Sequence, residues 1–418
     1  MKRHILVISQ YFFPETFRIN DICKSWVEKG YKVTVITGIP NYPEGKFYEG
    51  YSITKKRIEN YQGVQIIRLP IFPRGQSKIG LVLNYLSFVV SGYIWSLFSK
   101  LNPDHVFIFE VSPMTQALPG VWFAKRKKIP CSIYVQDLWP ENVEIVTGIK
   151  SQKVLGSIGK MVDYIYLNCS RIFTTSKSFV NAIIDRGVDQ DKVTYWPQYA
   201  EDVPCEATYK KKTSDELSII FTGNIGEAQG LGQLVTLAKA LKKLELDHKV
   251  HFTLVGEGRF KQNLINQINE CDVTHMFTFL GRVPSEQVPK ILQSHDVALL
   301  SLAPDPLFDM TIPAKLQTYL SVGMPILGLV SGESKSIIEE ANAGLIAPLK
   351  DTTLQLKCIQ KLLETNEEQL KVYRDNASDY AHRFFNKDKL MQKMDVYFEK
   401  IDFTEIDTKL EEKKYVRK

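Results

Sequence analysis

Short apolar runs typical of buried strands alternate with amphipathic, helix-like stretches along the whole chain. In the first half, the predicted strands cover residues 4–9, 32–37, 64–69, 105–109, 132–135 and 171–175. In the second half, they cover residues 217–221, 250–255, 277–279, 297–301, 326–329 and 345–347. Strands that alternate with helices predict parallel sheets covered by helices on both faces. Because the pattern occurs as two successive sets, we predict an α/β protein with two doubly wound domains.

A break in this pattern near residues 196–204 marks the expected join between the domains. Pro197 and Pro204 interrupt the regular alternation there. The length of 418 residues also favours two domains over a single hydrophobic core. We predict an N-terminal domain at 1–197, a C-terminal domain at 198–385, and a helix with a charged tail at 386–418. Open parallel sheets bind ligands beyond the carboxyl ends of their strands, so the reaction is expected in a cleft between the two domains.

Residues 221–232 (FTGNIGEAQGLG) form a glycine-rich turn between a predicted strand and a predicted helix. Such a turn leaves backbone N–H groups free, and the positive end of the helix dipole favours a phosphate there. Glycine turns also occur for packing reasons alone. A second segment, residues 311–326 (TIPAKLQTYLSVGMPI), places Lys315 on a later helix. The two segments together predict a nucleotide-diphosphate site in the C-terminal domain.

These two segments, in this order, resemble those of retaining nucleotide-sugar glycosyltransferases of the GT-B fold, family 4. Residues 11–15 (YFFPE), 135–141 (VQDLWPE) and 254–259 (LVGEGR) fit the same family, so the resemblance covers nearly the whole chain. Within the family, the chain looks most like bacterial O-antigen and capsule enzymes of the fucosamine-transferase type. The resemblance implies two Rossmann-like domains facing a central cleft, the N-terminal one for the acceptor and the C-terminal one for the nucleotide-sugar. It also implies that the last helix crosses back to the N-terminal domain.

The function implied by this resemblance is transfer of a sugar to a lipid-linked saccharide. The donor is expected to be a UDP-linked N-acetyl amino sugar, and the acceptor a polyprenyl-diphosphate-linked saccharide at the cytoplasmic membrane face. No metal ion and no cofactor are expected, since the nucleotide-sugar is itself a substrate. The motif Asp189-Gln-Asp191 matches a metal-binding signature of the other glycosyltransferase fold. It precedes a strand-like run instead of ending one, so we interpret it as a surface turn.

The chain departs from the family pattern at several donor positions. Asn224 and Gln229 stand where many members carry an arginine and a lysine that clasp the pyrophosphate. Thr318 and Met310 stand where the family has paired glutamates. Neutral side chains still donate or accept hydrogen bonds but supply no charge, so Lys315 becomes the first candidate for the pyrophosphate cation. The donor-binding candidates are Gly223, Asn224, Gly226, Gln229, Gly230, Arg259, Arg282, Asp309, Lys315 and Thr318.

Acidic and basic side chains also follow predicted strands of the N-terminal domain. Glu15 and Arg18 follow the first strand and are the acceptor-binding candidates, although a packed loop would also explain them. Asp137 and Glu141 follow another strand and are catalytic candidates together with Lys315. Two carboxylates on one loop suit acid and base catalysis or acceptor positioning. They could equally cap the helix that follows.

Residues 79–98 form an apolar run without a charged residue, flanked by Lys78 and Lys100. Three interpretations remain open for it: a membrane span, a buried core helix, and a helix that lies in the membrane interface. The run is about long enough to span a bilayer. A span would place strands of one predicted sheet on opposite sides of the membrane, so we favour interfacial docking.

Composition narrows the class of protein without identifying it. The net charge of +6 is modest and mixed, which does not favour a nucleic-acid partner but suits an anionic membrane face or a pyrophosphate ligand. Six scattered cysteines without a C-x-x-C pair predict neither a zinc site nor a disulfide framework, and fit a reducing cytosol. The fold leaves two alternatives to a transferase: a nucleotide-sugar 2-epimerase, or a non-catalytic pseudo-glycosyltransferase subunit.

Overall fold

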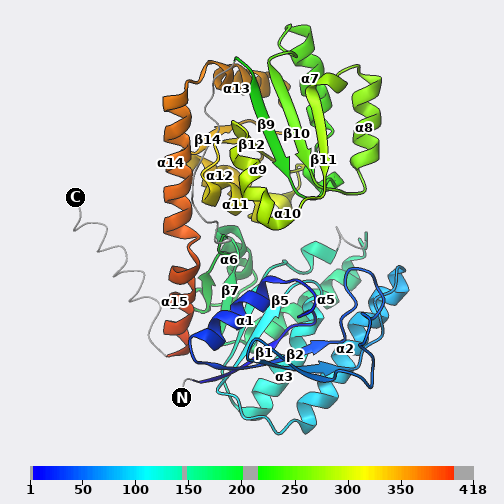
Figure 1. The fold of residues 1–418 in the computed structure, drawn as a ribbon. Helices are drawn as coiled ribbons and strands as arrows, with labels where there is room; N and C mark the ends of the chain where they lie inside the picture. The colour runs from blue at the N-terminus through cyan, green and yellow to red at the C-terminus, as the bar shows by residue number, and fades with distance from the viewer. Residues whose placement is uncertain (1–2, 144–147, 201–214, 400–418) are drawn as a thin grey trace, which may run out of the picture. The chain divides into compact units, whose positions relative to one another are not determined.

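The computed structural model describes residues 3–143, 148–200 and 215–399. The chain forms two compact units: unit 1 comprises residues 1–196 and 391–418, and unit 2 comprises residues 197–390 (Figure 1). The predicted charged tail at 404–418, residues 201–204 of the predicted join, and Cys205 lie outside the described residues. Both units contain a predominantly parallel sheet between layers of helices, as the alternating pattern predicts.

Unit 1 is built on an eight-stranded sheet with the order β3-β4-β2-β1-β5-β6-β7-β8. Its strands are β1 (His4–Ile8), β2 (Lys32–Gly38), β3 (Ile58–Tyr61), β4 (Val64–Leu69), β5 (His105–Glu110), β6 (Cys131–Val135), β7 (Arg171–Thr174) and β8 (Val193–Tyr195). All neighbours pair in parallel except β3, which is antiparallel to β4. The six predicted strands are confirmed. The strand-like run after Asp191 forms the edge strand β8. The other edge strand, β3, was not predicted, because it is short and carries no buried apolar position.

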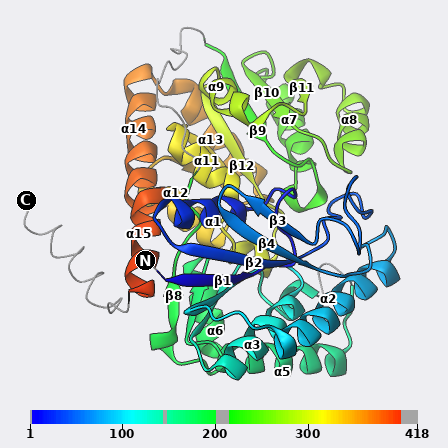
Figure 2. The same cartoon turned by 60° about the horizontal axis from the view of Figure 1, so that its bottom comes forward.

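The helices of unit 1 cover both faces of its sheet. They are α1 (Arg18–Glu28), α2 (Lys78–Phe98), α3 (Leu118–Lys127), α5 (Gln152–Leu167), α6 (Lys177–Asp185) and the end of α15 (Lys387–Phe398). Figure 2 shows α2, α3, α5 and α6 on one face. On the other face, the ring of Trp26 on α1 lies 5.3 Å from that of Phe398 on α15. Strand order reverses between β1 and β5, and such a switch point is where open α/β sheets bind ligands.

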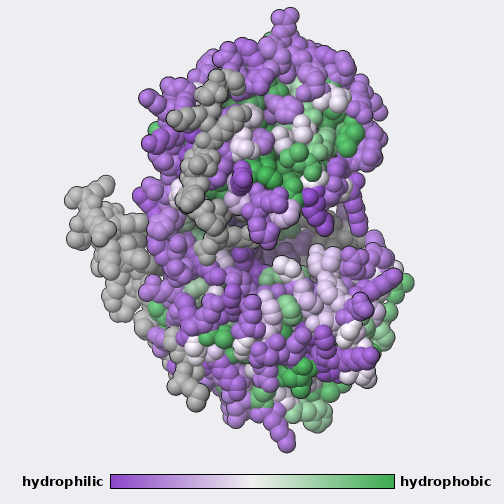
Figure 3. All heavy atoms as spheres, viewed as in Figure 1, coloured by the Kyte–Doolittle hydropathy of each residue, from purple (hydrophilic) through white to green (hydrophobic). Residues whose placement is uncertain are grey.

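Helix α2 presents most of its apolar surface outward. Its buried residues are Asn84, Phe88, Gly92 and Ser96, a narrow stripe with a spacing of four. This helix is long and apolar enough to cross a membrane by length and composition only, yet just 22% of its apolar window is buried. A core helix would be mostly buried, so the core interpretation of residues 79–98 does not hold. Apolar side chains reach the surface of unit 1 along α2 (Figure 3).

Unit 2 contains a six-stranded, wholly parallel sheet with the order β11-β10-β9-β12-β13-β14. All six strands were predicted: β9 (Leu217–Thr222), β10 (Val250–Val255), β11 (Phe277–Gly281), β12 (Val297–Ser301), β13 (Ile326–Leu329) and β14 (Gly344–Ile346). Its helices are α7 (Gln233–Lys243), α8 (Lys261–Glu270), α9 (Val288–Gln293), α10 (Pro306–Asp309), α11 (Ala314–Val322), α12 (Gly332–Ala341), α13 (Thr352–Glu364) and α14 (Glu367–Phe384). One apolar cluster packs α7, α8 and α13 on one face, and a second packs α9, α11, α12 and α14 on the other.

Candidate functional site

Two glycine turns interlock at the carboxyl edge of the sheet in unit 2. Gly223 after β9 has φ +130° and Gly256 after β10 has φ +137°, values that side chains other than glycine rarely adopt. A Cβ atom on Gly256 would lie 1.9 Å from the carbonyl oxygen of Gly223. The amide of Ile225 donates to the carbonyl of Glu257 at 2.8 Å. The turn after β9 is therefore braced by the next turn in space, and glycine is required for this contact.

The same turn is also fixed from β12. The hydroxyl of Ser301 donates to the carbonyl of Gln229 at 2.6 Å, and the amide of Ala303 donates to the carbonyl of Ala228 at 2.8 Å. Gly230 has φ +62°, so the backbone turns into α7 through a left-handed residue. The loop is thus shaped before any ligand arrives, which reduces the entropy that binding must overcome.

Lys315 extends from the first turn of α11 to this glycine turn. Its ammonium lies 4.2 Å from the centre of the Phe221 ring and donates to the side-chain carbonyl of Gln229. A Cβ atom on Gly223 would lie 3.6 Å from Nζ of Lys315. Gly223, Gln229 and Lys315, three of the predicted donor residues, therefore lie together.

The charge of Lys315 is not matched by an acid in its surroundings. Within the described part of the chain, Lys315 forms no ion pair. Desolvation lowers the pKa of its ammonium to about 7, because burial penalises the charged form. An arriving diphosphate would supply the missing negative charge, so the site is arranged for an anion.

Tyr319 supports this arrangement and was missed in the sequence. Its buried hydroxyl accepts a hydrogen bond from the amide of Thr222 at 3.0 Å and lies 3.2 Å from the Thr222 hydroxyl. The bond ties α11, and with it Lys315, to the end of β9. The signal was available, because Tyr319 follows Lys315 by four residues and four-residue spacing places both on one helix face.

Four other predicted donor residues do not join this group through hydrogen bonds: Arg259, Arg282, Asp309 and Thr318. Arg259 and Arg282 are exposed on the turns after β10 and β11. Asp309 accepts a hydrogen bond from Ser331 at 2.5 Å, and Thr318 donates back to the helix carbonyl of Ala314 at 3.2 Å. Asp305, near Asp309 in the sequence, caps α10 by accepting from the amide of Leu307 at 2.8 Å.

Asn224 and Gly226 lie on the same turn as Gly223. A Cβ atom on Gly226 would lie 2.8 Å from the side-chain nitrogen of Asn224, so the small residue leaves space for that amide. Asn224 itself is exposed. The turn therefore presents a side-chain amide toward solvent beside the backbone N–H groups.

In unit 1, Asp137 is anchored at the carboxyl edge of the sheet. One carboxylate oxygen accepts from both the amide and the hydroxyl of Ser112, each at 2.8 Å. The same hydroxyl accepts from Trp139 at 3.1 Å and from Asn142 at 2.8 Å. Asp137 is half-buried, whereas Glu141 is exposed. The loop thus holds one catalytic candidate rigidly and leaves the other on the surface.

Glu110, at the end of β5, is a buried acid that the sequence did not single out. One of its carboxyl oxygens lies 3.4 Å from the amide nitrogen of Asp137, and the other has no hydrogen-bond partner. Desolvation, and then the negative charge of Asp137, raise the pKa of Glu110 well above its usual value. A neutral Glu110 beside an anionic Asp137 is the arrangement that these neighbours favour.

The two acceptor candidates differ in what their side chains do. Glu15 is buried, and its carboxylate accepts from the amides of Asn41 and Tyr42, each at 2.7 Å. Burial raises the pKa of Glu15 to about 7 against these hydrogen bonds. Arg18 is half-buried at the start of α1 and lies near the phenol of Tyr134. Glu15 holds a loop in place, because both of its carboxylate oxygens accept hydrogen bonds from backbone amides.

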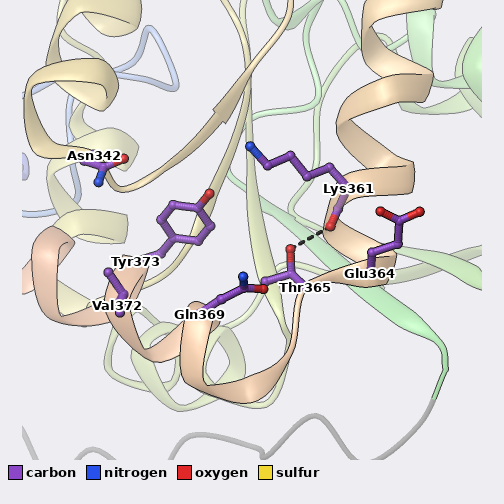
Figure 4. Close-up of a pocket in the computed structure, with 7 residues that line it drawn as sticks. All are labelled: Asn342, Lys361, Glu364, Thr365, Gln369, Val372 and Tyr373. Atoms are coloured by element: carbon purple, nitrogen blue, oxygen red, sulfur yellow. Dashed lines mark hydrogen bonds between the residues drawn. The ribbon is translucent and has the colours of Figure 1, made fainter.

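A surface hollow of about 520 Å³ in unit 2 does not belong to this site. Its lining comes from the end of α13, the start of α14 and the residue that follows α12 (Figure 4). That residue, Asn342, lies two residues before β14 and so marks the amino end of the parallel sheet. The glycine turns follow the carboxyl ends, so the hollow lies at the opposite edge.

Comparison with known proteins identifies the family. Residues 16–198 match the family described as glycosyl transferase 4-like domain, and residues 207–380 match glycosyl transferases group 1. These two matches together span most of the chain, which belongs to the group 1 glycosyltransferases of family 4. The protein is therefore a transferase of the glycosyltransferase class.

One relative and two solved structures are similar over most of the chain. WcaI of Escherichia coli (strain K12), a glycosyl transferase whose name assigns it to colanic acid biosynthesis, is 25% identical over 76% of this chain and 81% of its own. A sucrose-phosphate synthase from Thermosynechococcus elongatus has a TM-score of 0.71 at 13% identity, covering 95% of this chain and 98% of its own. Anabaena HepE in complex with UDP has a TM-score of 0.65 at 13% identity, covering 96% and 100%. These likenesses confirm two parallel-sheet α/β domains of the GT-B class.

Proposed function

We propose that this protein transfers a sugar, with retention of configuration, from a nucleotide-diphosphate sugar to a polyprenyl-diphosphate-linked saccharide. The observation that carries the proposal is the group of Gly223, Gln229 and Lys315, a backbone turn and a cation without an acidic partner. The donor is a UDP-linked N-acetyl amino sugar in this proposal. The solved complex of HepE with UDP and glucose supports a uridine nucleotide, and the relation to WcaI supports assembly of a bacterial surface polysaccharide such as O-antigen or capsule.

The donor pyrophosphate would lie against the glycine turn, close to the start of α7. Backbone N–H groups of the turn and the ammonium of Lys315 would bind its oxygens, with Gln229 and Asn224 as neutral donors. In the transfer, the acceptor oxygen forms a bond to the anomeric carbon while the bond to the leaving phosphate breaks. The acceptor proton passes to that phosphate on the same face, so UDP leaves and configuration is retained. Positioning and stabilisation of the phosphate charge then supply the catalysis, without a metal ion or cofactor.

Asp137 would orient the acceptor in this scheme. One of its oxygens is held by Ser112 in a fixed position, and a fixed carboxylate can accept a hydrogen bond from a sugar hydroxyl. Glu141 is exposed on the same loop and could contact a second hydroxyl. Neither residue needs to remove the proton, because the leaving phosphate takes it.

We further propose that α2 docks the protein on the cytoplasmic face of the cell membrane. The side chains of Ile79, Val90 and Phe98 are 74%, 59% and 77% exposed, which is unusual for apolar residues on one helix. Lys78 begins the helix and Lys100 follows it, and lysines beside an apolar surface suit anionic head groups. Strands β4 and β5, which precede and follow α2, belong to one sheet, so the helix lies on the membrane instead of crossing it.

A donor screen tests this function. Purified full-length protein would be incubated with UDP-, GDP- and dTDP-sugars and a short polyprenyl-diphosphate GlcNAc acceptor, with EDTA present in a parallel set. We expect release of UDP together with a gain of one sugar mass on the lipid, unchanged by EDTA. Isomerisation of the donor without an acceptor would indicate a 2-epimerase instead. Nucleotide binding without turnover of any donor would indicate a non-catalytic subunit.

A further inference from the structure

Unit 1 contains a group of aromatic side chains beside an arginine, at the same sheet edge as Asp137. We propose that this aromatic–arginine cluster, formed by Tyr11, Phe17, Tyr42, Arg74 and Tyr85, binds the sugar-diphosphate head group of the lipid-linked acceptor. The proposal rests on the function proposed above and assigns its acceptor site. It differs from the sequence hypothesis, which placed the acceptor at Glu15 and Arg18.

The aromatic rings form one continuous group. The rings of Tyr11 and Phe17 stack at 5.3 Å with an angle of 12° between their planes. The ring of Tyr42 lies 5.5 Å from each of them. Tyr42 is 38% exposed although it packs on two other rings, so the group offers an aromatic surface to solvent. The amphipathic ring of a tyrosine suits a sugar, which has an apolar face and polar edges.

Arg74 supplies a positive charge to this surface. Its guanidinium carbon lies 5.2 Å from the centre of the Tyr42 ring. Across the described ranges, Arg74 pairs with no carboxylate, whereas Arg68 in the same unit pairs with Glu59 at 2.6 Å. A guanidinium presents a planar fork of donors that matches phosphate oxygens. An arginine that stacks on a tyrosine and lacks an acidic partner is therefore suited to a diphosphate next to a sugar.

Tyr85 and Asp137 lie within electrostatic reach of this charge. Burial raises the pKa of the Tyr85 phenol, Arg74 acts to lower it, and Asp137 acts to raise it. The hydroxyl of Tyr11 is buried without a normal hydrogen bond, although the Tyr85 phenol lies close to it. A phosphate held by Arg74 would thus place the attached sugar near the carboxylate proposed to orient it.

Chain topology explains why these residues meet. Tyr11 follows β1, Tyr42 follows β2, Arg74 follows β4 and Asp137 follows β6, so all four lie beyond carboxyl ends of one parallel set of strands. Ligands of open α/β sheets bind at this edge. The cluster is therefore located where the fold itself predicts a ligand.

Buried polar side chains hold the cluster in place. Glu15 accepts from the amide of Tyr42 at 2.7 Å and fixes the loop that carries this ring. The side chain of Asn41 accepts from the amide of Arg74 at 2.9 Å. On α2, the side chain of Asn84 donates to the carbonyl of Phe72 at 2.6 Å and accepts from Gln10 at 2.7 Å. Glu15 is thus a positioning residue, and a preformed surface costs less entropy when it binds.

The exposed apolar side of α2 favours a lipid-linked ligand over a free sugar. Tyr85 lies on α2, and the side chains of Val82, Leu83 and Leu86 around it on the same helix are 53%, 47% and 53% exposed. A molecule with a sugar, a diphosphate and a prenyl chain would find an aromatic ring, a guanidinium and an apolar helix surface for its three parts. This combination favours a lipid-linked sugar diphosphate as the ligand.

Binding of the acceptor without any donor tests the cluster separately from catalysis. The probe is a short-chain prenyl-diphosphate GlcNAc in mild detergent, titrated into the full-length protein. We expect Arg74→Gln to weaken binding at least tenfold, and Arg74→Lys to weaken it less because the charge remains. Tyr42→Ala should weaken binding and Tyr42→Phe should retain most of it. Lys153→Gln, which removes one exposed charge on α5, is the matched control and should bind as the wild type does.

Two further probes separate the roles of the two side chains. A neutral alkyl GlcNAc glycoside should lose affinity with Tyr42→Ala but not with Arg74→Gln. A sugar-free prenyl diphosphate should show the opposite dependence. UDP binding, which is proposed for unit 2, should be unchanged in every variant, and an unchanged melting temperature should show that unit 1 is still folded.

Equal acceptor binding by wild type, Arg74→Gln and Tyr42→Ala would overturn the cluster and leave the transferase proposal standing. Absence of acceptor binding by the wild type would also overturn the cluster. Binding that follows the expected pattern, without sugar transfer from any donor, would instead refute the proposed function while keeping the site.

Discussion

Replacement of Lys315 by methionine gives the sharpest test of the donor site. Methionine has a similar length and keeps the contact with Phe221, but it carries no charge. Since the pKa of Lys315 is lowered to about 7, roughly one molecule in ten has a charged Lys315 at pH 8. A bound diphosphate favours the ammonium form and raises this pKa again. Binding of the donor at pH 8 should therefore take up close to one proton.

The magnitude follows from the same pKa. Proton uptake should be about 0.9 at pH 8, about 0.5 at pH 7 and about 0.1 at pH 6, because the free site is already protonated at lower pH. Donor affinity should fall by about tenfold for each pH unit above 7, until the pKa of the bound state is reached. Lys315→Met should remove both effects. It should also weaken donor binding at pH 7 at least tenfold, which corresponds to about 1.4 kcal/mol.

Isothermal titration calorimetry in two buffers with different ionisation enthalpies measures this uptake directly. The titrant should be a UDP-sugar and not UDP, because the free terminal phosphate of UDP titrates near pH 6 and would add its own protons. Lys290→Met, an exposed lysine on α9, serves as the control. Proton uptake that is absent in the wild type, or equal in wild type and Lys315→Met, would refute the assignment of Lys315 to the diphosphate.

Stability should respond to the same substitution in a defined direction. The folded pKa of Lys315 lies below its unfolded value of 10.5, so the cost of burying the charge is present in full below pH 7. This cost declines as pH rises from 7 to 10.5. Without ligand, Lys315→Met should therefore raise the melting temperature at pH 6, and the gain should shrink toward pH 10. A gain that grows with pH would contradict the lowered pKa.

Three further outcomes are expected. Asp137→Asn should lower kcat at least tenfold with the donor KM unchanged, and Ser112→Ala should show a smaller loss because the backbone amide of residue 112 still donates to Asp137. Steady-state kinetics would contradict this if the donor KM alone changed. Leu86→Glu combined with Val90→Glu should reduce binding to anionic vesicles at least tenfold in a sedimentation assay, while activity on a short soluble acceptor is retained. Unchanged vesicle binding would exclude α2 as the docking surface. Gly256→Ala should lower the melting temperature and abolish UDP binding, because the new Cβ would lie 1.9 Å from the carbonyl oxygen of Gly223. A wild-type melting temperature and wild-type UDP binding in this variant would show that the two turns are not interlocked.

The fold could be predicted well because strands in both units are short, apolar and separated by helices. The residues of β9 and β12 are almost entirely buried, so their sequences are continuous apolar runs. Strand β3 escaped prediction for the opposite reason. It lies at the edge of the sheet, where its exposed Ile58 and polar neighbours give no clear pattern. The pairing of β3 with β4 depends on the tertiary position of β4 and not on local preference.

Residues of the candidate site could be predicted only where the backbone a few residues away requires that type of residue. The backbone at Gly223, with φ +130°, requires a glycine, and a turn that opens a helix has a typical composition, so both can be recognised in the sequence. Glu110 has no such local pattern, because its burial and its carboxyl oxygen without a hydrogen-bond partner depend on distant segments of the chain. Glu15 was selected as an acceptor contact because it is charged and follows a strand. Its hydrogen bonds to Asn41 and Tyr42 show why charge and position alone do not reveal where a carboxylate points.

The sequence by itself determined the alternation of elements, the glycine turns and the lysine-bearing helix, because each depends on neighbours a few residues away. It could not decide which side of the apolar helix α2 faces inward. The structure buries Asn84, Phe88, Gly92 and Ser96 and leaves the larger apolar side chains outside. Asn84 is inside because Gln10 and the carbonyl of Phe72 satisfy its amide, and these partners come from other parts of the chain. The burial of a polar side chain depends on such distant partners, and only the tertiary structure supplies them.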